Sequence, residues 1–111
     1  MTAKRILVVS LDVDLGHSRA LLLERQGYRV DTVATDDEAM LMLESTTFAL
    51  VLLGRDSLLF EKRLDERIRQ RYPKQLTLKV QPAVDEISLY PSRTIDSEPR
   101  HVIDAIREML K

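Results

Sequence analysis

The sequence predicts an α/β fold in which a parallel sheet of about five strands carries helices on both faces. The first observation is the nearly continuous apolar segment Phe48–Leu53, which Gly54 follows. A strand has this composition when both of its faces are buried, as happens inside a parallel sheet. The second observation is a similar apolar segment, Ile6–Val9, near the start of the chain. The third is that segments with helical spacing alternate with strand-like segments along the chain.

Composition limits the classes of function. The 111 residues suit one domain, residues 1–111, with one core. The formal net charge of -1 gives no general attraction for nucleic acid or for an anionic membrane. The absence of cysteine excludes a disulfide framework, a thiol nucleophile and a cysteine-based zinc site. No apolar segment reaches transmembrane length, and we expect a cytoplasmic protein.

The first helix is expected between the strand Ile6–Val9 and Gly27. Ser10 is the polar end of the strand, and Asp12 or Asp14 can cap the helix that follows. Gly27 is placed where a helix commonly ends. The apolar stripe of this helix consists of Leu15, Leu22 and Leu23.

A second strand and a second helix precede the central strand. Tyr28–Val33 alternates between polar and apolar residues, which indicates a more exposed strand. Thr35–Glu38 has the pattern of a capping box, with acidic residues at the positive end of the helix dipole. Ligands in an open α/β sheet bind beyond the carboxyl ends of central strands. Gly54 therefore occupies the position where a working group is expected.

The second half of the chain contains two predicted helices and two predicted strands. Leu58–Tyr72 is typical of a charged amphipathic helix, and Glu98–Leu110 has the spacing of a helix with one buried face. Leu76–Val80 alternates and is expected nearer an edge of the sheet. Ile87–Tyr90 is expected to be the last strand.

The connection between the last two predicted strands is short. The residues between Val80 and Ile87 are too few for a crossover helix with its connections. Either a bare loop joins two parallel strands, or the pair forms an antiparallel hairpin. Pro82 favours a turn.

Several segments share a pattern across nearly the whole chain: Lys4–Val9, Leu23–Val30, Glu38-Ala39-Met40 with Leu43, Leu50–Leu53, and Tyr90-Pro91 before the last helix. Together they resemble the receiver domain of bacterial two-component response regulators. The resemblance implies a flavodoxin-like doubly wound sheet with the strand order 2-1-3-4-5. The fourth helix of that fold is expected to be missing or reduced.

The resemblance also implies a site in which a histidine kinase passes a phosphoryl group to an aspartate with the help of Mg²⁺. Ser10 and Leu11 stand where the family has two acidic residues, and Gly54 stands where it has the acceptor aspartate. By the same alignment Gln81 takes the hydroxyl position at the end of the fourth strand, and Tyr90 takes the lysine position at the end of the fifth. Ile87 takes the switch-aromatic position, and Ser57-Leu58 replaces the usual Met-Pro pair.

These departures predict that the usual reaction is lost. Transfer to a carboxylate needs a nucleophile, a cation held by oxygen ligands and a positive charge near the phosphoryl oxygens. Gly54 provides no nucleophile, Leu11 no oxygen ligand and Tyr90 no fixed positive charge. We therefore expect an atypical, degenerate receiver that is not an enzyme, holds no metal or cofactor, and acts through protein interactions.

Two alternatives stay open. Asp12 or Asp56, at the rim of the expected pocket, could be a noncanonical phosphoacceptor or metal ligand, although a helix cap and a turn residue are the simpler roles. The emptied pocket beside Leu11 and Gly54 could instead bind a small ligand. Gly54 itself is either a turn glycine with a positive φ or a place where another group approaches the backbone.

The expected partner is a signalling protein, either a histidine kinase or a downstream protein, or a second copy of the chain. A missing helix would leave apolar sheet surface exposed, and this surface with the last helix is the predicted interface. The apolar residues concerned are Leu76, Leu78, Val80, Ile87 and Leu89. A nucleic-acid partner is not expected, since acidic residues interleave with the arginines of the third helix. The histidines, His17 and His101, are expected on the surface.

Overall fold

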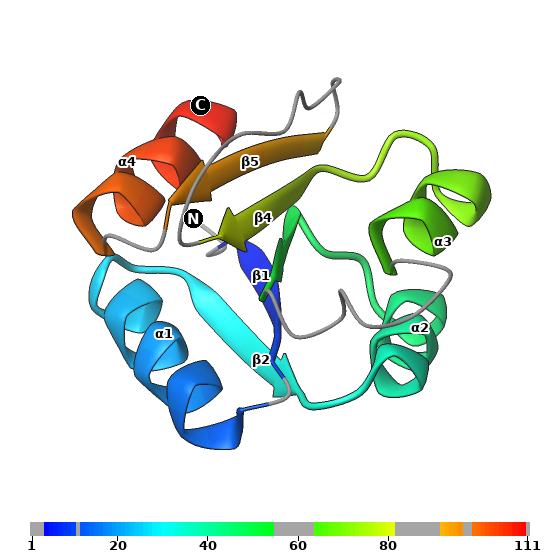
Figure 1. The fold of residues 1–111 in the computed structure, drawn as a ribbon, viewed down its shortest axis with the longest axis horizontal. Coiled ribbons are helices and arrows are strands. Elements are labelled where there is room, and N and C mark those ends of the chain that lie inside the picture. Colours follow the sequence, from blue (N-terminus) through cyan, green and yellow to red (C-terminus); the bar gives the residue numbers. More distant parts are fainter. Residues whose placement is uncertain (1–3, 11, 55–63, 82–91, 97–98, 111) are drawn as a thin grey trace.

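One parallel sheet of five strands forms the centre of the molecule, with the order β2-β1-β3-β4-β5 (Figure 1). The computed structural model describes residues 4–10, 12–54, 64–81, 92–96 and 99–110. The pairings β1–β2, β1–β3, β3–β4 and β4–β5 are all parallel. The predicted fold class and strand order are therefore confirmed. The strands are β1 (Arg5–Val9), β2 (Arg29–Val33), β3 (Leu50–Leu53), β4 (Thr77–Gln81) and β5 (Ser92–Asp96).

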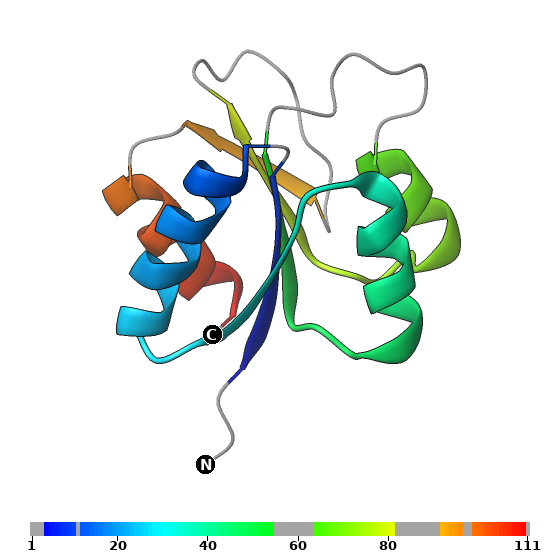
Figure 2. The same cartoon turned by 90° about the horizontal axis from the view of Figure 1, so that it is seen from below.

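Helices cover the sheet in two layers. Figure 2 shows α1 and α4 on one face and α2 and α3 on the other. This arrangement follows from right-handed crossovers between parallel strands. The described helices are α1 (Val13–Arg25), α2 (Asp36–Ser45), α3 (Leu64–Arg71) and α4 (Pro99–Met109).

Alternation along the buried strands divides the core in two. The first cluster, between the sheet and helices α1 and α4, contains Ile6, Val8, Leu50, Leu52, Leu78, Val80, Leu23 and Ile106. The second, between the sheet and helices α2 and α3, contains Leu7, Val9, Val51, Leu53, Leu43, Leu64 and Ile68. All four residues of β3 are buried. This confirms that the apolar run predicted at the start is a strand with two buried faces.

The predicted caps of the first two helices are confirmed. Asp12 is the N-cap of α1, whereas Asp14 lies in its first turn. Thr35 is the N-cap of α2, and its Oγ1 accepts a hydrogen bond from the Glu38 N–H at 3.2 Å. Gly27 follows the end of α1 with a φ of 96°, a conformation that glycine adopts without strain.

The position of the fifth strand corrects the prediction. The sheet takes Ser92–Asp96 as β5, whereas the sequence favoured Ile87–Tyr90, which lies outside the described residues. The hairpin alternative is wrong, because β5 runs parallel to β4 with Thr77 opposite Ser92. The expectation of a reduced fourth helix falls on residues 82–91, and the expected start of the third helix falls on residues 58–63; both ranges lie outside the described residues.

The expectation of exposed apolar surface on the fourth strand is also wrong. Leu78 and Val80 have exposed fractions of 0% and 1%, and both pack in the cluster that contains α4. Leu76 is partly buried against the same cluster. The last helix therefore covers the apolar face that was predicted to be open. Ile87 and Leu89 lie outside the described residues.

The alternate positions of β4 and β5 are polar. Thr77, Lys79 and Gln81 of β4 are in register with Ser92, Thr94 and Asp96 of β5.

Candidate functional site

The candidate site lies at the carboxyl edge of the sheet, beside the ends of β1 and β3. Val9 and Leu53 are in register at the ends of these strands, and the Gly54 N–H donates a hydrogen bond to the Val9 carbonyl at 2.9 Å. Ser10 and Gly54 therefore lie side by side. The strand order reverses between β1 and β3, which is where open α/β sheets bind ligands.

Ser10 closes the end of β1. Its side chain is buried, with an exposed fraction of 3%, and its Oγ donates a hydrogen bond to the Asp12 carbonyl at 2.9 Å. Its N–H donates to the Val33 carbonyl of β2 at 3.0 Å. The hydroxyl thus holds the turn into α1. A hydroxyl is neutral, so it attracts a divalent cation less than a carboxylate would.

Asp12 acts as the cap of α1. The Leu15 N–H donates to Asp12 Oδ1 at 3.1 Å, and the Gly16 N–H donates to the Asp12 carbonyl at 3.0 Å. Both groups satisfy N–H donors that the first helical turn would otherwise leave unpaired. The simpler of its two predicted roles is therefore the one that the structure shows.

The other predicted site residues are only partly described. Gln81 ends β4, whereas Leu11, Asp56, Ile87 and Tyr90 lie outside the described residues. The two interpretations of Gly54 depend on the residues that follow it, so both remain predictions.

The structure nevertheless corrects the position given to Tyr90. Tyr90 precedes β5 in the sequence and does not end it; the strand ends at Asp96. An acidic residue, not a lysine, therefore ends the strand that precedes the last helix. The switch-aromatic position was counted from Tyr90, so Ile87 loses that assignment as well.

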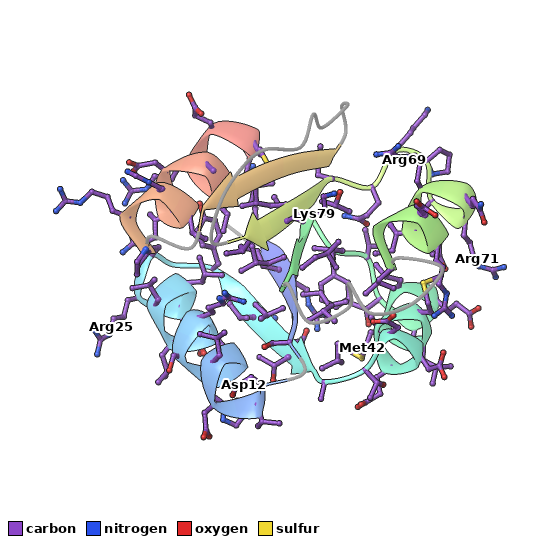
Figure 3. All side chains as sticks on the ribbon, in the orientation of Figure 1. Asp12, Arg25, Met42, Arg69, Arg71 and Lys79 are labelled. Atoms are coloured by element: carbon purple, nitrogen blue, oxygen red, sulfur yellow. The ribbon has the colours of Figure 1, made fainter. Side chains whose placement is uncertain are left out.

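Lys79 is a residue of the site region that sequence reasoning missed. It is half-buried on β4, in register with Leu53. Figure 3 labels Lys79 over the middle of the sheet and Asp12 at the start of α1. The expected strand order could have indicated this partial burial. In that order β4 lies between β3 and β5, so a lysine on β4 has a neighbouring strand on each side.

A pocket of about 180 Å³ adjoins Ser10. It lies between the carboxyl ends of β1 and β2 and the first turns of α1 and α2, and its lining residues do not include Gly54. The lining consists of Ser10, Val13, Gly16, His17, Thr32, Val33, Ala34 and Glu38. A second, more open hollow of about 550 Å³ lies near the opposite ends of β3 and β4, between Phe48 and Leu76. The first pocket is the one beside the candidate site.

Carboxylates gather at the first turn of α2. Burial raises the pKa of Asp36, and the neighbouring charge of Asp37 raises it further, while Arg67 acts in the opposite direction. Arg67 of α3 forms an ion pair with Asp37 at 3.4 Å. Within the described ranges, no three histidine or acidic side chains are grouped closely enough to hold a metal ion.

The basic third helix is paired with the acidic second helix. Besides the Arg67–Asp37 pair, Arg71 forms an ion pair with Glu44 of α2 at 3.2 Å. Both pairs join α3 to α2, whereas the sequence showed acidic residues interleaved with the arginines of the third helix itself. His17 and His101 are exposed, as expected. Among the residues that the structure describes, no helix has the length and apolar character of a membrane span.

Comparison with known proteins gives matches to solved structures. No protein-family model matches the sequence, and no curated protein matches it either. A CheY-like response regulator receiver domain protein from Methanospirillum hungatei JF-1 is 26% identical, with a TM-score of 0.80 over 98% of this chain and 94% of that chain.

Two further matches involve the response regulator protein TrrA. TrrA from Thermotoga maritima, in complex with Mg²⁺ and BeF, is 19% identical with a TM-score of 0.77 over 97% of this chain and 99% of that chain. The structure of histidine kinase ThkA in complex with TrrA matches at 18% identity and a TM-score of 0.79, over 97% of this chain and 99% of that chain. The strand order, the two helical layers and these likenesses show that the chain has the fold of response-regulator receiver domains.

Proposed function

We propose that this receiver domain takes part in two-component or phosphorelay signalling by binding another protein, without phosphorylation at the usual position and without enzymatic activity. The observation that carries the proposal is the pair Ser10 and Gly54. These residues end the two central strands side by side, and neither offers a carboxylate to a cation or a phosphoryl group. The domain keeps the scaffold of a receiver while lacking the groups that the reaction needs.

The proposed partner is a signalling protein, and the proposed location is the cytoplasm. The structure of ThkA with TrrA contains a histidine kinase beside a response regulator of the same fold. Large apolar side chains are exposed on α1 at Val13, Leu15 and Leu21. Exposed apolar residues on one helix favour contact with another protein. They support α1 as part of the interaction surface in place of the apolar strand surface predicted from the sequence.

Labelling with acetyl phosphate and Mg²⁺, read by intact-mass spectrometry, tests the loss of phosphorylation. We expect no adduct under conditions that label an active receiver domain in parallel. An adduct mapped to Asp56 or Asp12 would establish the noncanonical alternative instead. Substituting each aspartate by asparagine would then show which one carries the phosphoryl group.

Titration with millimolar Mg²⁺ tests the metal site separately. We expect neither thermal stabilisation nor a saturable shift of the NMR resonances of Ser10, Asp12 and Gly54, because Ser10 gives no charged ligand and Asp12 caps α1. A ligand that binds the native state raises its stability, so melting temperature is a direct readout. A saturable shift centred on Asp12 would overturn this part of the proposal.

A further inference from the structure

The pocket beside Ser10 has the size of a single side chain. Its volume is about 180 Å³, whereas pockets for drug-sized ligands start at about 300 Å³. Gly16 keeps the pocket wall flat, because a Cβ at this position would lie 3.3 Å from Ser10 Cβ. The site therefore suits a slender group better than a nucleotide or a ring system.

The lining of the pocket is part aliphatic and part polar. Val13, Val33 and Ala34 provide aliphatic surface, and the polar side chains are those of Ser10, His17, Thr32 and the exposed Glu38. Glu38 is held in place because its Oε1 accepts a hydrogen bond from Thr35 Oγ1 at 3.0 Å. A carboxylate accepts several hydrogen bonds, so this contact does not exhaust its capacity.

Acidic residues dominate the two helix ends beside the pocket. The first turns of α1 and α2 contain Asp14, Asp36, Asp37 and Glu38; Arg67 pairs with Asp37, and of these acids Glu38 lines the pocket, together with His17. These acids stabilise the helix ends, but their field also extends over the pocket mouth. Because no three potential metal ligands are grouped within the described ranges, a coordinated metal ion is not the occupant indicated. An aliphatic chain with a cationic head complements the aliphatic lining and the carboxylate of Glu38.

We propose that this pocket receives one lysine or arginine side chain of a partner protein. The inference rests on the proposed function, because it names the chemistry of the partner that this domain binds. A protein side chain is favoured over a free small cation because Val13 of the pocket lies on the same helix as Leu21. Their exposed fractions are 53% and 61%, and a spacing of eight residues places them on one helix face. A partner surface can cover both, with the cationic side chain inserted beside Val13.

The first test uses n-butylguanidinium as the probe and neutral n-butylurea as its matched control, with the full chain observed by NMR. We expect saturable shifts at Gly16, Thr32 and Glu38 with the cation and none with the urea. The variant Glu38→Gln keeps a side-chain oxygen that can accept the hydrogen bond from Thr35, but it removes the negative charge. It should weaken the binding of n-butylguanidinium about five-fold. Glu24→Gln, the same change in the last turns of α1, should leave binding unchanged. Equal shifts from both probes, or no shift, would overturn the proposal.

The second test separates a partner side chain from a free cation. An alanine-based helical peptide with one arginine and one leucine is compared with the same peptide carrying norleucine in place of arginine. We expect the arginine peptide to bind more tightly than butylguanidinium, and Leu21→Glu to weaken the peptide without affecting butylguanidinium. If the peptide binds no better than butylguanidinium, a free small cation is the occupant and the partner assignment is wrong. Neither binding result depends on phosphorylation. Labelling of an aspartate would refute the proposed function, but the binding of the peptide and of butylguanidinium could still be measured and interpreted.

Discussion

Ser10 Oγ donates a hydrogen bond to the main-chain carbonyl of Asp12 at 2.9 Å, and this bond fixes the turn between β1 and α1. The same carbonyl accepts from the Gly16 N–H of the first helical turn. The side chain at the end of β1 thus has a structural partner inside the chain. The turn is stabilised by hydrogen bonds between neutral groups.

Ser10→Ala should therefore lower stability. The variant leaves the Asp12 carbonyl with one donor fewer in a buried turn, and we expect the free energy of unfolding to fall by about 1 kcal/mol. Urea unfolding at pH 7 measures the change. Ser18→Ala is the matched control, because Ser18 is exposed on α1 and should give a change near zero. Equal stability of Ser10→Ala and the wild type would show that the hydrogen bond contributes nothing.

Leu78→Ala should behave as a core substitution. Leu78 is fully buried between the sheet and α4, so the variant should lose about 3 kcal/mol of unfolding free energy. Leu41→Ala is the control, since Leu41 on α2 has an exposed fraction of 65% and should tolerate the change. Sedimentation measures self-association. If Leu78→Ala kept full stability and reduced self-association, the result would support the interface predicted from the sequence.

The strands with two buried faces and the capped helices could be predicted from the sequence. Phe48–Leu53 is apolar throughout, and Thr35 with Glu38 satisfies the first turn of α2 by a purely local pattern. Each of these inferences depended on a periodicity or a contact within a few residues.

The fifth strand could not be located by the same means. β5 has the sequence Ser-Arg-Thr-Ile-Asp, which contains one apolar residue, whereas Ile87–Tyr90 combines β-favouring and apolar residues. An edge strand forms backbone hydrogen bonds with one neighbouring strand only. Its position is therefore determined by this backbone pairing and not by the burial of its side chains. The half-burial of Lys79 and the pocket beside Ser10 depend on distances between elements, which no local pattern encodes. The error in β5 carried over directly into the roles given to Tyr90 and Ile87.

Asp36→Asn should change the pH dependence of stability. Burial raises the pKa of Asp36 above its ordinary value of 3.8, so the folded state holds this proton more tightly than the unfolded state. The contribution of Asp36 to stability is thus present at pH values below 3.8 and is lost as the pH rises through the folded-state pKa. The variant, which cannot ionise, should gain stability relative to the wild type between acidic pH and pH 7. Urea unfolding across this range measures the difference in stability. If the variant lost stability relative to the wild type as the pH rises, the pKa of Asp36 would be lowered in the folded state and not raised.

Gly54→Asp alone should not restore phosphorylation. The variant places a carboxylate at the end of β3, but Ser10 beside it remains neutral and Asp12 remains engaged as the cap of α1. The strand before the last helix ends in Asp96, so no lysine is supplied there to balance the phosphoryl oxygens. Nucleophilic attack needs the carboxylate, the cation and the positive charge together, and one of the three is not enough. Acetyl phosphate labelling with Mg²⁺, followed by mapping of any adduct, measures the outcome.

The double variant Ser10→Asp, Gly54→Asp separates the remaining causes. Labelling of the double variant alone would identify the missing metal ligand as the limiting loss. Labelling of the single variant at position 54 would show that the site needs only its nucleophile, and the proposal of a domain that has lost the reaction would fail.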